Sequence, residues 1–283
     1  MAVDEAMLEE IGRLGGPATL RLYAWSPPCL SLGYSQPYAD VDENRLVGRG
    51  WDVVRRPTGG RAILHTDELT YSIVSPANAG VVSGSLMDSY DVLAGALLHA
   101  VRLLGINAEA KARAGPARSS ANPVCFEVSS AHEITVEGKK LVGSAQARRK
   151  GAVLQHGSLP LTGDLGRITQ VLVFDDETTR RDSAARLLGC ATTVESALGL
   201  PVPWSAAAEA MIQGFGAALG LRFDPAALSK REERRAAELV EEKYGHASWT
   251  RRAQALPHGV RSGGEWNGVS LRGGSIARDH RRT

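Results

Sequence analysis

The stretch from Asp52 to Pro76 constrains the fold more than any other part of this sequence. It holds three short segments in which apolar, β-branched and aromatic residues predict β-strands, at 51–55, 61–65 and 69–74. Between the first two lies a turn in which Pro57 fixes φ and lacks an N–H donor, while Gly59 and Gly60 permit positive φ or close backbone approach. The stretch therefore predicts strands packed around a tight glycine turn.

Three arginines, Arg55, Arg56 and Arg61, flank this turn. Guanidinium groups beside exposed backbone N–H groups form a cradle for an anionic or carbonyl-bearing ligand. For an Arg-Gly-Gly turn alone, a tight hairpin with solvated cations is the more common outcome. The longer string around the turn favours a ligand site.

Three blocks of the sequence carry one recognisable pattern. They read RRPTGGRAILH followed by ELTYSIV from Arg55, PVCFE from Pro123, and VEGKKLVGSAQARRKGAVLQHGSLPL from Val136 to Leu161. Together they resemble the octanoyl-acyl-carrier-protein:protein N-octanoyltransferases of the lipoate–protein ligase A-like branch, which belong to the biotin/lipoate protein ligase catalytic-domain family. The similarity runs from about Met1 to Trp249.

The resemblance implies an α/β fold of the α+β type, with a mixed, largely antiparallel β-sheet packed with helices. It implies one catalytic domain over 1–250, in which the strand that usually opens the family's domain is either absent or lies upstream of Met1. Residues 251–283 are rich in Gly and Arg and lack periodicity, so we expect a disordered tail.

Periodicity predicts the remaining elements. Apolar residues at helical spacing predict helices at 1–14, 40–47, 85–104, 205–219 and from Ser229 to Lys243, the last opened by a Ser229/Glu232 capping box. Alternating segments predict strands at 20–23, 30–34, near Ala108, and at 133–136, 140–145 and 152–161.

Composition restricts the setting and the partners. A formal net charge of +2 gives no argument for nucleic-acid binding, and no apolar run approaches the roughly 18 residues that span a bilayer. The acidic, amphipathic start is unlike a secretory signal. Cys29, Cys125 and Cys190 are widely spaced, which favours free thiols. We expect a cytoplasmic monomer that binds neither membrane nor nucleic acid and needs no cofactor or metal.

Cys125 is the candidate nucleophile. A thiolate is the protein nucleophile best suited to a thioester, and passing an acyl group from thioester to thioester and then to an amine requires no ATP. A lone cysteine is more often buried and structural. In the family a cysteine in this Val-Cys-Phe context takes the acyl group, and the resemblance carries that role to Cys125.

Lys140 is the second candidate catalytic residue, and the family's functional lysine also precedes a hydrophobic-x-Gly-Ser/Thr step. Its ammonium can hold the acyl carbonyl and offset charge in the tetrahedral intermediate. Strand alternation turns Lys139 toward solvent. An ordinary surface lysine after a hairpin is the alternative. We expect Lys140→Ala to slow acyl loading and transfer while the protein stays folded.

The remaining candidates are expected to bind substrate. On one side they are Arg56, Gly59, Gly60, Arg61 and His65, and on the other Gly143, Ser144, Gln146, His156, Gly157 and Ser158. His65 can exchange a proton near neutral pH, although a histidine at a strand end is as often structural. The family commonly places Asp directly after this histidine, whereas this chain has Thr66 and then Asp67, which leaves a His–Asp pairing open.

These observations predict an octanoyltransferase of lipoate biosynthesis. Its expected donor is octanoyl-acyl carrier protein, and its expected acceptor is a lysine of a lipoyl domain such as the glycine cleavage H protein. One alternative is an ATP-dependent lipoate or octanoate ligase that forms an acyl-adenylate, although ligases of the family usually carry a third glycine where this chain has Arg61. Another is a noncatalytic protein that binds lipoyl domains or acyl groups.

Overall fold

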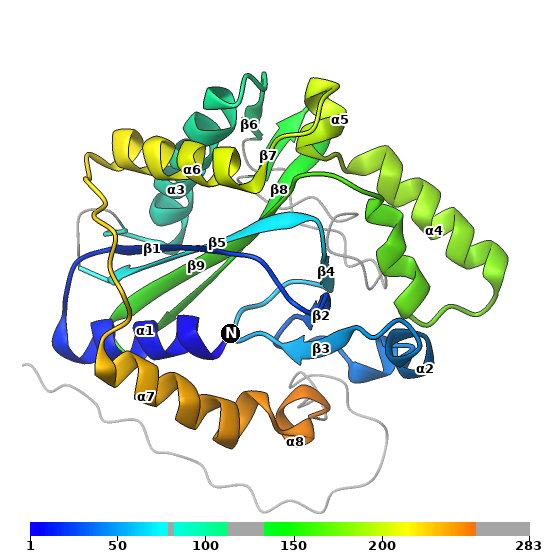
Figure 1. Ribbon diagram of the computed structural model, residues 1–283, viewed down its shortest axis with the longest axis horizontal. Helices are drawn as coiled ribbons and strands as arrows, with labels where there is room; N and C mark the ends of the chain where they lie inside the picture. Colours follow the sequence, from blue (N-terminus) through cyan, green and yellow to red (C-terminus); the bar gives the residue numbers. More distant parts are fainter. Residues whose placement is uncertain (79–81, 112–132, 253–283) are drawn as a thin grey trace, which may run out of the picture. The chain divides into compact units, whose positions relative to one another are not determined.

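The computed structural model describes residues 1–78, 82–111 and 133–252 (Figure 1). Contacts divide the chain into two units, Met1–Ala253 and Gln254–Thr283, and the helices and strands belong to the first unit. Its strands are β1 (Thr19–Tyr23), β2 (Cys29–Leu32), β3 (Asp52–Arg55), β4 (Ile63–His65), β5 (Glu68–Pro76), β6 (Glu109–Lys111), β7 (Glu133–Val136), β8 (Lys139–Arg149) and β9 (Ala152–Pro160).

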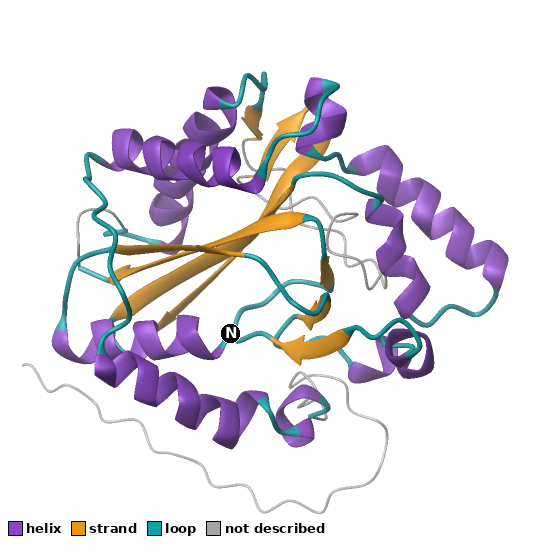
Figure 2. Ribbon diagram, in the orientation of Figure 1, coloured by secondary structure: helices purple, strands orange, loops and turns teal. Residues whose placement is uncertain are grey.

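Helices fill most of the remaining described chain (Figure 2). The α-helices are α1 (Ala2–Leu14), α2 (Glu43–Val47), α3 (Leu86–Leu103), α4 (Glu177–Cys190), α5 (Val194–Leu198), α6 (Trp204–Leu219), α7 (Lys230–Leu239) and α8 (Ala247–Thr250). The 3₁₀ segments η1 (Tyr38–Asp40) and η3 (Leu165–Val171) and the π-helical segment η4 (Val240–Tyr244) complete them.

Two sheets organise these elements. The larger has the strand order β1-β5-β9-β8-β7-β6, and each neighbouring pair is antiparallel. The smaller has the order β3-β2-β4, in which β2 runs parallel to β3 and antiparallel to β4. This arrangement confirms the predicted mixed, largely antiparallel β-structure packed with helices.

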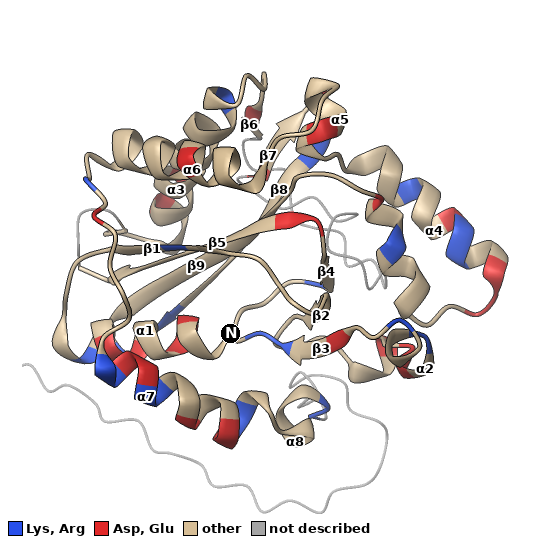
Figure 3. Cartoon of the chain, viewed as in Figure 1, with Lys and Arg blue, Asp and Glu red and all other residues tan. Residues whose placement is uncertain are grey.

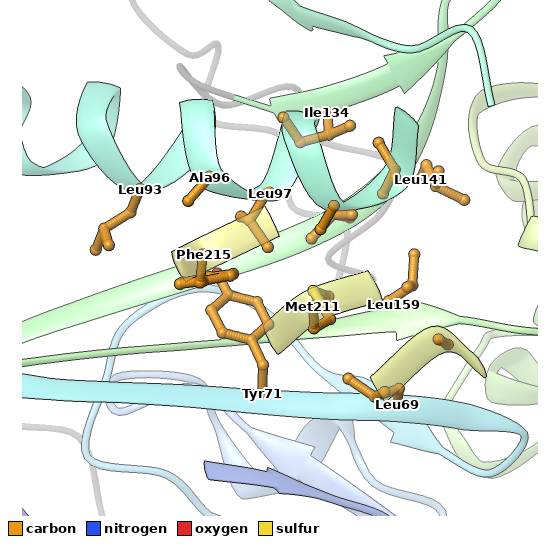
Figure 4. Packing of buried hydrophobic residues seen from close by; sticks show 14 of the residues in the cluster. Leu69, Tyr71, Leu93, Ala96, Leu97, Ile134, Leu141, Leu159, Met211 and Phe215 are labelled. Atoms are coloured by element: carbon orange, nitrogen blue, oxygen red, sulfur yellow. The ribbon is translucent and has the colours of Figure 1, made fainter. Parts of the chain in front are cut away.

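The hydrophobic core lies on one face of the larger sheet. Alternate residues of β5 and β9, such as Tyr71 and Leu159, meet Leu97 of α3 and Phe215 of α6 (Figure 4). The rings of Tyr71 and Phe215 lie 5.7 Å apart between centroids. Since side chains alternate along a strand, the intervening residues of β5 point to the opposite side of the sheet, toward α1, and they are buried there as well.

The opposite face is covered by α1, against which α7 packs (Figure 1). Met7 and Leu8 of α1 contact Val74 and Leu154 of the sheet. Acidic and basic residues mix along α7 (Figure 3), and Arg235 forms an ion pair of 2.7 Å with Glu9 of α1. On this face β5 and β9 carry buried polar side chains, among them Thr70, Ser72 and His156. A binding or catalytic site can form around them.

Most predicted elements are confirmed, with two informative differences. The predicted helix over 40–47 is divided, since Asp42 adopts an extended conformation and caps α2 through the N–H of Arg45. The strand predicted at 140–145 continues to Arg149 because residues 143–149 all pair with β9. The predicted Ser229/Glu232 capping box is present.

Candidate active site

A cavity lies beside the glycine turn, where β2, β4, β5, β8 and β9 meet. Its empty volume is about 410 Å³, open solvent at its mouth included. The lining residues include seven of the predicted substrate-binding residues: Arg56, Gly60, His65, Gly143, Ser144, His156 and Gly157. Two of the three sequence blocks, about 100 residues apart, thus supply one cavity, because β8 and β9 pair beside β5. The third block, at Pro123, lies outside the described residues.

Arg56 holds the glycine turn closed. Its guanidinium is buried and donates to the carbonyl oxygens of Ser31 at 3.0 Å, Gly59 at 2.9 Å and Arg61 at 2.7 Å. Gly60 has a φ of 93°, which disfavours any residue with a Cβ. Gly59 and Arg61 shape this turn through their carbonyl groups and do not contribute to the described lining of the cavity.

Arg55, the first arginine of the same motif, has a different task. Its guanidinium is 1% exposed and donates to the carbonyl oxygens of Gly33 at 2.8 Å and Thr250 at 2.8 Å. The expected cradle of three arginines is therefore wrong for Arg55, which fastens α8 to β3. Strand alternation explains the difference, since neighbouring residues point to opposite faces.

His65 is held on both ring nitrogens. Nε2 lies 2.8 Å from Oγ of Ser31, and Nδ1 lies 2.5 Å from Oε1 of Glu68. The indole of Trp25 stacks on the imidazole at 4.4 Å between centroids. Asp67, two positions after the histidine, is not its partner, because Asp67 pairs with Arg167. The carboxylate partner is Glu68, three positions after the histidine.

Glu68 is buried and receives further donors. The hydroxyl groups of Thr70 and Ser158 hydrogen-bond to its two oxygens. Thr70 in turn accepts from the indole N–H of Trp25 at 2.9 Å. Ser158, a predicted substrate-binding residue, therefore contacts Glu68, and it does not belong to the described lining of the cavity. Sequence reasoning missed Glu68 and Ser31, and only the His-x-x-Glu spacing across the β4–β5 turn signalled the first.

His156 and Asp4 form a second buried pair under the cavity. Nε2 of His156 lies 2.6 Å from Oγ1 of Thr58, and Nδ1 lies 3.8 Å from Asp4. Burial lowers the pKa of His156, and nearby Asp4 offsets only part of that effect. Burial alone would raise the pKa of Asp4, but nearby His156, the N-terminal amine and the charge of Arg21 outweigh burial, so its pKa is lowered. His156 is therefore neutral at pH 7, and Asp4 is ionised.

The second wall comes from the paired strands β8 and β9. Gly143 lies opposite Ser158 and Ser144 opposite Gly157. A Cβ on Gly157 would stand 2.3 Å from the carbonyl oxygen of Gly143, so only glycine allows this approach. The side chain of Ser144 hydrogen-bonds to Tyr71 at 2.7 Å, toward the hydrophobic core.

Gln146 also faces the side of the sheet that carries α3. Its amide nitrogen donates to Gln155 at 3.1 Å, and its oxygen accepts from Ser89 of α3 at 3.1 Å. Gln146 is absent from the described lining of the cavity. Its contact with substrate stays a prediction.

Lys140 is buried, and its Nζ lies 2.5 Å from Oε1 of Glu133. The predicted alternation is confirmed, since neighbouring Lys139 is exposed and donates to the carbonyl oxygen of Leu188 at 3.3 Å. Lys140 is not among the described residues that line the cavity. Glu133 begins β7 and follows directly on 112–132 in the sequence.

Cys125 lies outside the described residues, so its distance from Lys140 stays a prediction. The two described cysteines differ. Cys29 is buried, and burial raises the pKa of its thiol to about 12, which suits a packing role. Cys190, at the end of α4, is exposed. Within 1–78, 82–111 and 133–252, no group of three or more His, Cys, Asp or Glu residues could hold a metal ion.

Curated relatives match this chain along most of its length. The octanoyltransferases LipM of Symbiobacterium thermophilum and Kyrpidia tusciae are 39% and 41% identical to it, each over 89% of this chain and 93% of the relative. The octanoyltransferase LipM of Moorella thermoacetica is 41% identical with the same coverage.

Solved structures are similar as well. A bipartite lipoate protein ligase of Thermoplasma acidophilum, studied with its E2 lipoyl domain, has a TM-score of 0.74 at 25% identity and covers 90% of this chain and 92% of its own. Lipoate-protein ligase A bound with ATP has a TM-score of 0.72 at 26% identity, covering 88% and 92%. A family model described as the lipoyl protein ligase A/B catalytic domain matches residues 1–216. With a cavity built from two of the predicted blocks, these matches show that the chain belongs to the lipoyl protein ligase A/B catalytic-domain family.

Proposed function

We propose that this chain is an octanoyltransferase of lipoate biosynthesis. It takes an octanoyl group from octanoyl-acyl carrier protein onto Cys125 and passes it to a lysine of a lipoyl domain, such as that of the glycine cleavage H protein. The observation that carries the proposal is the convergence of His65, Gly143 and His156 on one cavity, in a chain about 40% identical to octanoyltransferases. We place this activity in residues 1–250 and in the cytoplasm.

The chemistry needs no external energy source. The Cys125 thiolate attacks the donor thioester, its S–C bond forms, and the carrier thiol leaves with a proton. The acceptor amine then attacks the new thioester, an N–C bond forms, and the Cys125 sulfur leaves. The first step exchanges one thioester for another, and the second makes a more stable amide.

The lining of the cavity offers apolar surface to an acyl group. Ile63 and Ala145 contribute apolar surface, and glycines at 60, 143 and 157 let backbone approach the ligand. Burying each CH₂ of an octanoyl chain stabilises the complex by about 0.8 kcal/mol. Lys140, held by Glu133, is proposed to offset the charge of the tetrahedral intermediate.

An ATP-dependent lipoate or octanoate ligase is the second candidate. One observation favours it, because lipoate-protein ligase A bound with ATP shares this fold at 26% identity. Such an enzyme activates a free acid as an adenylate and needs no nucleophilic thiol. Arg61 and Cys125 favour transfer over ligation.

The test mixes the purified protein with octanoyl-acyl carrier protein and a lipoyl domain in the absence of ATP. Mass spectrometry is expected to find octanoate first on the protein and then on the acceptor lysine. Cys125→Ala should abolish both adducts, whereas Cys190→Ala, which removes an exposed thiol, should leave both. Acceptor modification that requires ATP and survives Cys125→Ala would identify a ligase. An intact protein that modifies nothing under either condition would be a binding protein.

A further inference from the structure

Three buried polar side chains form a continuous hydrogen-bonded chain at the cavity, and the proposed function gives none of them a role in proton transfer. Ser31 and His65 line the cavity and lie 2.8 Å apart between Oγ and Nε2. Glu68 stands on the far side of the imidazole, 2.5 Å from Nδ1. The transfer step needs a group that takes the proton lost by the acceptor amine.

The hydrogen bonds assign the tautomer of His65. Thr70 accepts from Trp25 Nε1, which can only donate, and its own O–H is then directed at Glu68. Ser158 donates to the second oxygen of the same carboxylate. A carboxylate surrounded by donors on both oxygens accepts from Nδ1–H of His65. The lone pair of His65 is therefore on Nε2, on the side of the cavity.

His156 is less suited to the same task. Its Nδ1 is 3.8 Å from Asp4, whose oxygens already accept from Arg21 at 2.8 Å, Tyr23 at 2.9 Å and Ser72 at 2.9 Å. Glu68 contacts its histidine directly, so it stabilises the imidazolium that forms when a proton is taken up.

We infer that His65 is the general base of the transfer step and that Glu68 is its positioning residue. The acceptor lysine arrives as an ammonium at neutral pH, and Nε2 of His65 takes one of its protons and later releases it to solvent. As the resulting amine forms the N–C bond and the C–S bond breaks, its second proton leaves nitrogen and the departing Cys125 sulfur becomes a free thiol. The hydroxyl of Ser31 occupies Nε2 until the amine arrives. The inference rests on the proposed function.

The first experiment separates proton transfer from structure. Wild-type protein and His65→Gln are loaded from octanoyl-acyl carrier protein, and the loss of the Cys125 adduct is timed with a lipoyl domain or with hydroxylamine, which is already unprotonated at neutral pH. For His65→Gln we expect transfer to the lysine to fall about 100-fold or more and transfer to hydroxylamine to fall less than tenfold. Glu68→Gln should follow the same pattern with a smaller loss.

Two exposed residues provide matched controls. His99→Gln on α3 and Glu209→Gln on α6 make the same chemical changes away from the cavity and should keep wild-type rates. Equal losses with both acceptors in His65→Gln, or transfer within threefold of wild type, would overturn the inference. Failure of the wild-type protein to load Cys125 would instead refute the proposed function.

A second measurement needs no variant. The ¹⁵N NMR spectrum of the histidine rings in the wild-type protein should show His65 with a protonated Nδ1 and an unprotonated Nε2. A proton on Nε2 of the neutral ring would overturn the inference whether or not His65→Gln folds. The His65 signals can be assigned from a Glu68→Gln spectrum, in which the Nδ1 resonance should move most.

Discussion

At the scale of single residues, charged groups around the cavity are buried and determine one another's chemistry. Arg56 closes the glycine turn through its carbonyl oxygens, and Glu68 orients His65. Lys140 and Glu133 are both about 5% exposed. A charged residue at a buried position near the cavity therefore indicates a partner within the fold as much as it indicates a ligand.

Lys140→Ala is expected to lower both half-reactions and also to lower the stability. Replacing one member of a buried ion pair typically costs about 3–5 kcal/mol, so we expect the variant to stay folded but to have a lower free energy of unfolding. The double variant Lys140→Met/Glu133→Gln should recover most of that free energy of unfolding without recovering acyl transfer. Urea unfolding and the mass-spectrometric assay measure the two effects. Full activity in Lys140→Ala would show that Lys140 is structural only.

Acid is expected to destabilise the protein through Asp4. The unfolded chain binds a proton at Asp4 near pH 3.9, whereas the lowered pKa keeps folded Asp4 ionised. The unfolded state therefore binds more protons at low pH, so this contribution is complete well above pH 3.9 and is lost as the pH falls from about 5 toward 2. Asp4→Asn should be about 3 kcal/mol less stable at pH 7 and should flatten this acid dependence. Urea titrations between pH 2 and 7 measure both, and an unchanged slope would contradict the assignment.

At the scale of elements, the pairing of β8 with β9 and of β9 with β5 brings the site together. Gly157 sits in the middle of this arrangement, and a Cβ there would meet Gly143 at 2.3 Å and Tyr71 at 2.6 Å. The strands can approach only because that position lacks a side chain.

Gly157→Ala is expected to destabilise the protein by about 3 kcal/mol and to distort the cavity. Gly95→Ala on α3 provides the control, because a Cβ there meets nothing within 4 Å and alanine favours a helix by roughly 1 kcal/mol. Thermal unfolding should therefore move in opposite directions for the two variants. A Gly157→Ala protein as stable as wild type would show that the strands can separate without cost.

At the scale of the folded unit, its two ends are joined to the centre by side chains distant in sequence. Arg55 donates to Thr250, and Trp249 donates back to the carbonyl oxygen of Arg55 at 2.8 Å. Arg252 lies over the ring of Tyr34, 3.5 Å from its centroid. At the other end of the unit, α1 supplies Asp4, which accepts from Ser72 of β5 and lies beside His156 of the cavity. The described unit thus uses residues from both ends of its chain.

A chain that ends at His246 should be less stable than one that ends at Arg252, by about 3 kcal/mol. The shorter chain removes two hydrogen bonds to the buried Arg55 guanidinium, each worth about 1.5–3 kcal/mol. Comparing the two truncated proteins isolates α8, and urea unfolding measures the difference. Equal midpoints would mean that Arg55 finds other acceptors.

The sequence by itself determined the elements and the family pattern. The helical spacing of α3 and the capping box of α7 are local, since their physical causes lie within a few residues. Alternation along β8 likewise separated buried Lys140 from exposed Lys139. The motif blocks indicated which residues gather, and seven of them line one cavity.

Only the tertiary structure decided the partners. That Glu68 rather than Asp67 orients His65, that Asp4 lies beside His156, and that Arg55 binds Thr250 depends on strand register and on segments up to 195 residues apart. Periodicity reports which face a side chain occupies but not what stands across from it. Contact between buried charges is set by packing, which no local pattern encodes.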